Sequence, residues 1–128
     1  MKNFREFKIW TLGMDIVKHT YAIASLLPES EKFGLKSQIT RAAVSVPSNI
    51  AEGSAKTSDK EFRVYLESAM GSLFELETQL LLINELDMVG MVDLKELLAK
   101  INEEQKMLNS FITVVKSRYT KTGPNPKS

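Results

Sequence analysis

Hydrophobic residues recur every three or four positions in four stretches of the chain, which is the spacing of one face of an α-helix. The most regular stretch covers about 59–86, and similar rows predict helices over about 5–27, 35–51 and 94–118. The apolar row of the 59–86 stretch consists of Phe62, Leu66, Ala69, Leu73, Leu76, Leu80 and Ile83. No stretch alternates with a period of two, so no β-sheet is expected.

Residue pairs typical of capping boxes, in which two side chains satisfy free backbone amides, stand at the start of three stretches. They are Asn3 with Glu6, Ser58 with Glu61, and Asp93 with Glu96. Four amphipathic helices with short connections predict an all-α, antiparallel up-down-up-down four-helix bundle, which would occupy residues 1–120. Residues 121–128 combine lysines with Gly123, Pro124 and Pro126, which is typical of a flexible basic tail.

Pro47 falls inside the second predicted helix. Proline has no backbone N–H, and its ring clashes with the carbonyl four residues earlier, which here belongs to Ala43. We therefore expect this helix to be kinked at Pro47.

A polar stripe runs along one flank of the same helix, and it consists of Gln38, Arg41, Ser45, Asn49 and Glu52. It is consistent with a ligand groove or recognition strip, or with a polar network at a helix–helix or subunit contact. Polar rows beside a kink usually satisfy backbone groups, which favours the network. Glu77 lies in the apolar face of the third helix and needs a partner if it is buried. Arg41 is a candidate partner, because a guanidinium binds a carboxylate with two hydrogen bonds, and the alternative is a bond from Glu77 to Ser45 or Asn49 of the stripe.

The first predicted helix carries two apolar rows, which together cover roughly 200° of its circumference, more than a single core stripe needs. Val44 and Leu82 also point away from the core faces of their own helices. Contiguous apolar surface usually marks a protein interface, so self-association is expected. The predicted oligomer interface consists of Ile9, Leu12, Ile16, Ile23, Val44 and Leu82.

The amino-acid composition excludes several kinds of catalytic and metal site. The 128 residues include no cysteine and one histidine, which excludes disulfides, thiolate zinc sites and histidine-rich metal centres. The glycines never cluster into a phosphate-binding loop, and His19, one turn after Asp15, is interpreted as a partly exposed helix residue. No catalytic residue, metal, cofactor or small-molecule substrate is therefore expected. Without a signal peptide or an apolar run long enough for a membrane span, a cytoplasmic location is expected.

The formal net charge is only +1, but the positive charges are unevenly placed. Two clusters are candidates for contacts with nucleic-acid phosphates, and they consist of Lys56, Lys60 and Arg63, and of Lys116, Arg118 and Lys121. The alternative for each cluster, which the small net charge favours, is a solvated charged helix end. In the second cluster, cations would also be favoured by the dipole at a helix C-terminus.

Two segments resemble the signature of a known bacterial family. Residues 37–53 read SQITRAAVSVPSNIAEG, and residues 58–80 read SDKEFRVYLESAMGSLFELETQL. With the opening FREFKIW and Trp10, they resemble the four-helix-bundle proteins encoded in intervening sequences of large-subunit ribosomal RNA genes. The resemblance covers about 4–118. Thr40 stands where the family often has an arginine beside Arg41, which weakens the case for a basic strip on that helix.

The resemblance implies a homopentamer, built as a barrel-shaped ring of bundles, and no established enzymatic activity. A related branch is the accessory protein of diversity-generating retroelements, which binds nucleic acid and a reverse transcriptase through a basic surface. The resemblance therefore predicts a non-catalytic oligomeric module associated with RNA, with a ribosome or with a reverse transcriptase. The alternative is a ring-shaped protein-binding scaffold without affinity for nucleic acid.

Overall fold

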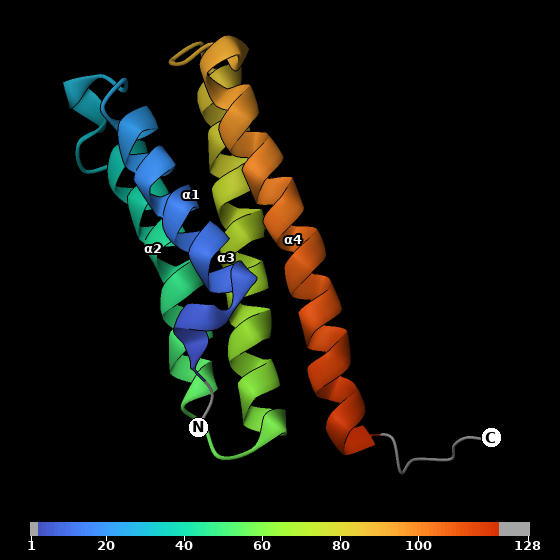
Figure 1. Ribbon diagram of the computed structural model, residues 1–128. Helices are drawn as coiled ribbons and strands as arrows, with labels where there is room; N and C mark the ends of the chain where they lie inside the picture. The colour runs from blue at the N-terminus through green and yellow to red at the C-terminus, as the bar shows by residue number, and fades with distance from the viewer. Residues whose placement is uncertain (1–2, 121–128) are drawn as a thin grey trace.

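Four long helices follow one another in the computed structural model, which describes residues 3–120. They are α1 (Lys8–Ala24), α2 (Leu35–Ser54), α3 (Asp59–Glu85) and α4 (Met91–Thr120), with single 3-10 turns η1 (Phe4–Glu6) and η2 (Glu29–Glu31) before α1 and α2 (Figure 1). Each helix packs on two neighbours, α1 and α3 both lying against α2 and α4. The predicted all-α four-helix bundle is confirmed. The predicted tail, residues 121–128, lies outside the described residues.

The core follows the predicted apolar rows of α2 and α3. All seven members of the α3 row are buried, as are five on α2, namely Ile39, Ala42, Ala43, Val46 and Ile50. At one end of the core three rings meet, with Phe111 centred 5.0 Å from Phe7 and 5.8 Å from Phe62. Among residues 3–120, no helix combines the length and the apolar character needed to cross a membrane.

Helix α1 turns a different face to the core from the one the sequence predicts. Ile9, Ile16 and Ile23 are 2%, 0% and 4% exposed, so they cannot form a subunit interface, and that part of the prediction is wrong. The physical reason is that Gly13 and Thr20 are buried between them and complete one row at spacings of four and three residues. This row fits between α2 and α4, because its small residues allow close approach.

The remaining members of the predicted interface lie nearer the surface. Leu12 is half-buried, whereas Val44 and Leu82 are 40% and 44% exposed. The outer row of α1 contributes Met14 and Tyr21, which are also exposed. An interface would therefore involve this outer row in place of the three isoleucines.

The helix starts show which capping predictions hold. The Ser58 N-cap is formed, since the Glu61 amide donates to Ser58 Oγ at 3.1 Å, whereas the Glu61 carboxylate accepts from the Ser58 hydroxyl at 3.3 Å. Asn3 instead caps η1, accepting from the Arg5 amide at 3.2 Å, and α1 begins only at Lys8. Asp93 lies inside the first turn of α4 and does not precede it.

Helix α2 continues through Pro47 from Leu35 to Ser54, and a kink at Pro47 stays a prediction. Two polar side chains of the stripe bond backbone carbonyls close to the proline. Ser45 Oγ donates to the Ala42 carbonyl at 3.0 Å, and Asn49 Nδ2 donates to the Ser45 carbonyl at 2.7 Å.

Candidate nucleic-acid interface

The antiparallel topology brings the two predicted basic clusters to the same end of the bundle. This end holds the start of α3 and the last turns of α4, and we call the surface formed by Lys56, Lys60, Arg63, Lys116 and Arg118 the basic end. Arg118 pairs with Asp59 at 3.7 Å, and the Arg63 guanidinium lies 5.7 Å from the ring centre of Tyr119. The two clusters therefore form one continuous surface. Lys121, the sixth predicted residue, lies outside the described residues.

Charge is segregated along the bundle even though the net charge is only +1. Arg5 of η1 and Lys8 at the start of α1 lie at the same end of the bundle, where residues 3–8, 52–63 and 114–120 hold seven cations and four acids. At the opposite end, residues 26–37 and 84–96 hold six acids and three lysines. Within residues 3–120, a polyanion would thus be attracted to the basic end more than to the opposite end.

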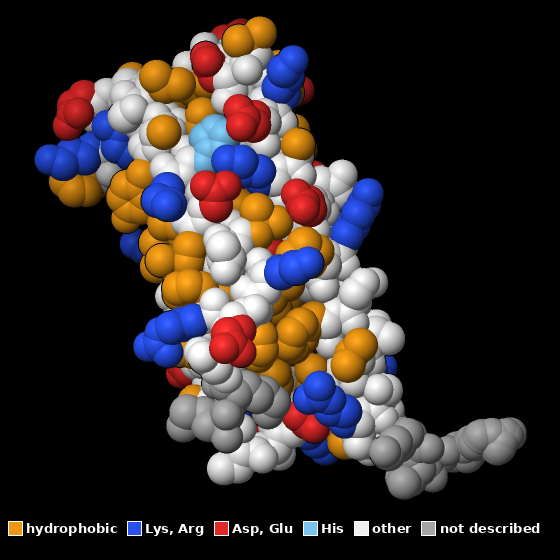
Figure 2. Space-filling model, in the orientation of Figure 1, with side chains coloured by type: hydrophobic (Ala, Val, Ile, Leu, Met, Phe, Trp, Pro, Cys, Tyr) orange, Lys and Arg blue, Asp and Glu red, His pale blue; other side chains and the backbone are white. Residues whose placement is uncertain are grey.

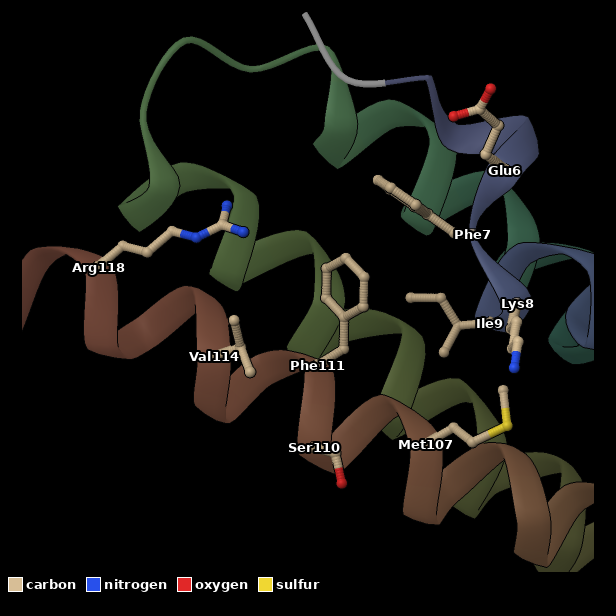
Figure 3. Close-up of a pocket in the computed structure, with 9 residues that line it drawn as sticks. All are labelled: Glu6, Phe7, Lys8, Ile9, Met107, Ser110, Phe111, Val114 and Arg118. Carbon is tan, nitrogen blue, oxygen red and sulfur yellow. The ribbon is translucent and has the colours of Figure 1, made fainter.

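A groove adjoins the basic end, between the start of α1 and the C-terminal half of α4 (Figure 3). Its volume is about 600 Å³, and its apolar walls are Phe7, Ile9, Met107, Phe111 and Val114. The polar lining residues are Glu6, Lys8, Ser110 and Arg118. The groove exists because α1 begins beside Phe111, whereas α4 continues to Thr120. Figure 2 shows hydrophobic side chains gathered between α1 and α4 on this face.

A second apolar surface lies on the outer side of the α1–α2 contact. Trp10, Met14 and Val17 of α1 and Val44 and Pro47 of α2 line a groove of about 330 Å³. We call these five residues the seam surface. Helix α3 presents a separate exposed apolar face on another side of the bundle, and it includes Phe74, Leu81 and Leu82.

The predicted polar stripe on α2 is only partly a network. The Ser45 hydroxyl is hydrogen-bonded with the Ser72 hydroxyl of α3, and Gln79 Nε2 of α3 donates to Gln38 Oε1 at 3.4 Å. Asn49 bonds within α2, and Arg41 and Glu52 are exposed.

The predicted contact between Arg41 and Glu77 is not formed among the described residues. Glu77 Oε1 instead accepts from Gln105 Nε2 of α4 at 2.8 Å. The reason is that Glu77 lies on the side of α3 that meets α4, whereas Ser72 and Gln79 lie on the side that meets α2. Glu77 ties α3 to α4, and its side chain is only half-buried.

Among residues 3–120, the fully buried carboxyl group is that of Glu104, which lies in the apolar face of α4. It is 0% exposed, and both of its carboxyl oxygens have no hydrogen-bond partner among the described residues. Burial, with a smaller contribution from the charge of Glu103, raises its pKa from the ordinary 4.5 to about 8. The spacing of residues along the sequence indicates this burial, because Glu104 lies three residues after Ile101 and four before Leu108, in the row of α4 that faces the core.

Gly13 makes room for that carboxyl group. A Cβ added at Gly13 would lie 3.3 Å from Glu104 Oε2 and 3.6 Å from Pro47 Cβ, so Gly13→Ala should destabilise the fold by about 1–3 kcal/mol through overpacking. Gly71 is the matched control, because a Cβ there meets nothing within 4 Å. Gly71→Ala should instead stabilise α3 by about 0.5–1 kcal/mol. Urea denaturation measures both, and equal effects of the two substitutions would contradict close packing at Gly13.

Catalytic chemistry has little support in the described residues. No group of three or more potential metal ligands occurs among residues 3–120. Asp15 is held by Lys100 at 2.9 Å, and this hydrogen bond lowers the pKa of its carboxyl group. Asp15 is therefore engaged away from His19, one turn further along α1.

Comparisons with known proteins agree with this fold. A solved structure from Bacteroides thetaiotaomicron, described as a protein of unknown function from the S23 ribosomal protein family, superposes with a TM-score of 0.76. It is 22% identical and covers 81% of this chain and 97% of its own, which shows a shared fold. No curated protein matches the sequence. The model of the 23S rRNA-intervening sequence protein family matches residues 5–110. The chain therefore belongs to the 23S rRNA-intervening sequence protein family.

Proposed function

We propose that this chain is a non-catalytic, self-associating helical module that binds RNA through its basic end. The observation that carries the proposal is the meeting of both basic clusters at one end of a nearly neutral chain. Contacts with phosphates need local positive charge, and segregation supplies it without a high net charge. The family's link to a ribosomal RNA gene supports RNA as the polyanion.

The test is RNA binding by a charge-reversed protein. Lys60→Glu with Lys116→Glu removes two exposed cations from the basic end. The matched control, Lys32→Glu with Lys95→Glu, makes the same change in net charge at the acidic end. The proposal expects the first variant to lose most of its affinity for a labelled RNA hairpin and the control to lose little.

A protein partner is the second candidate ligand, and the groove beside the basic end favours it. Its walls are apolar side chains, which are suited to a hydrophobic segment and not to phosphates. A protein that binds no RNA but is captured by a nucleic-acid enzyme through Phe7 and Phe111 would support this candidate over the first.

Self-association rests on the two apolar surfaces described above, the seam surface and the exposed face of α3. These are different surfaces on different sides of one chain, so they favour a head-to-tail contact, in which the seam surface of one subunit meets the α3 face of the next. Such a contact closes into a ring when the rotation from each subunit to the next adds up to a full turn. A pentamer is the ring that the family resemblance implies. Repetition of the basic end around such a ring would strengthen a weak contact with RNA through avidity.

Light scattering on mixed variants tests the head-to-tail contact. Val44→Asp and Leu82→Asp should each abolish the ring, because each places a charge on one of the two surfaces. Mixed together, they should form a dimer of about twice the chain mass, since each protein retains the surface that the other has lost. A mixture that stays monomeric contradicts this arrangement, and so does an unmutated chain that is monomeric at micromolar concentration.

A further inference from the structure

The side chain of Glu104 extends from α4 across its contact with α1, towards the point where Gly13 of α1 packs on Pro47 of α2, and neither of these two residues has a side-chain donor. Its Oε2 faces Gly13, which has no side chain, and Pro47, which has no N–H, packs against the same position. The side chain is fully buried and neither oxygen has a partner among the described residues. In such surroundings a carboxyl group keeps its proton, and a protonated carboxyl group is itself a donor.

On the facing helix, Pro47 leaves a buried carbonyl without its usual donor. In a regular α-helix the amide of residue 47 would donate to the Ala43 carbonyl, and proline cannot do so. Ala43 is 0% exposed, so water does not readily replace the missing amide. The neighbouring carbonyls of Ala42 and Ser45 do have hydrogen-bond donors, because they accept from side chains of the polar stripe. A buried carbonyl without a donor is costly to the fold.

We propose that Glu104 is a proton-dependent latch that holds α4 to the α1–α2 pair. Its neutral carboxyl group donates a hydrogen bond to the Ala43 carbonyl through the space that Gly13 leaves open. The buried carboxyl group, which has no partner among the described residues, and the carbonyl that Pro47 deprives of its helical donor thereby satisfy one another. Loss of the proton removes the donor, places a charge in the core and loosens the contact.

The charged groups on the surrounding helices do not provide an alternative partner. On α1, Asp15 pairs with Lys100, and on α3, Glu77 accepts from Gln105. The other charged side chains along the α1–α4 contact are exposed, and they are Lys8 and Lys18 on α1 and Glu103 on α4. Arg41 and Glu52 on α2 are exposed as well. Residues 42–51 have no ionisable side chain. Burial and the acceptor on α2 therefore govern the titration of Glu104, and its raised pKa of about 8 keeps the latch closed at neutral pH.

Carbon-13 NMR titration of the Glu104 carboxyl group tests the acceptor. In the unmutated chain the midpoint should lie near 8. Pro47→Ala restores the amide donor to Ala43 and competes with Glu104, so the midpoint should fall by about one unit or more towards the ordinary value. Val46→Ala is the control, because it opens space in α2 without adding an N–H, and its midpoint should stay near that of the unmutated chain. A midpoint near 4.5 in the unmutated chain overturns the proposal. An unchanged midpoint in Pro47→Ala overturns it equally.

Amide hydrogen exchange tests the release of the latch. Comparison with Glu104→Gln at each pH removes the intrinsic pH dependence of exchange, and glutamine keeps an N–H donor throughout. Between about pH 5 and about pH 8, opening in the unmutated chain should become about tenfold more frequent per pH unit than in the variant, and then level off. The excess should be confined to amides around Ala43 and Glu104. Parallel exchange in the two proteins, or an excess spread evenly over all four helices, contradicts the release step.

Discussion

Between about pH 5 and about pH 8, the free energy of unfolding should fall by about 4 kcal/mol through Glu104 alone. In the unfolded chain this carboxyl group ionises near its ordinary pKa of 4.5, whereas in the folded chain it keeps its proton until about pH 8. The folded state therefore binds more protons in this window, and stability is lost as the pH rises. Below about 4.5 both states are protonated and above about 8 both are ionised, so the change is confined to this range.

Urea denaturation of the unmutated chain and of Glu104→Gln at the two pH values measures this effect. The difference in unfolding free energy between the two proteins should shift by about 4 kcal/mol, with the variant relatively more stable at the higher pH. Asp15, whose pKa is lowered by its hydrogen bond with Lys100, contributes in more acidic solution and is present in both proteins. An identical pH dependence of the two proteins would show that Glu104 is not a buried, protonated group.

Ile16→Asp should unfold the chain, with a loss of about 4–5 kcal/mol or more, because it buries a charge in a packed core without a partner. Ile16 is fully buried, whereas Met14, two residues earlier on α1, is 40% exposed. Met14→Asp should therefore leave the helical content and the melting temperature nearly unchanged while it weakens self-association. Circular dichroism and light scattering separate the two outcomes. A folded but monomeric Ile16→Asp chain would mean that this residue lies in a subunit interface after all.

The sequence predicts α3 well because its signals agree with one another. The row from Phe62 to Ile83 is unbroken at spacings of four and three residues, and Ser58 and Glu61 mark the start of the helix. In α1 the signals conflict, since both rows of large side chains are apolar. Which row turns inward depends on Gly13 and Thr20, which an apolar count passes over but which fit the narrow space between α2 and α4.

The polar residues of the core illustrate a second limit on sequence reasoning. Glu77 and Glu104 both interrupt apolar faces, and hydrophobicity alone does not say which one is buried. Glu77 lies one position off the regular row of α3, whereas Glu104 occupies a position within the row of α4. The partner of a polar group depends on which neighbouring helix it meets, so Gln105 in place of Arg41 emerges only from the packed structure.

The two basic clusters were identifiable as separate helix ends, and the antiparallel order of the helices brings them together. A charge contributed by Arg118 is partly neutralised by Asp59, which the sequence spacing does not predict. The candidate site is thus a product of topology more than of any local motif.

The salt dependence of affinity measures whether RNA binds through the basic end. If about five cations contact phosphates, the logarithm of the association constant for the labelled hairpin should fall against the logarithm of salt concentration with a slope of about −4. Lys60→Glu with Lys116→Glu should make that slope shallower by about two, whereas Lys32→Glu with Lys95→Glu should leave it unchanged. A slope near zero, or equal effects of the two double variants, would contradict an RNA interface at the basic end.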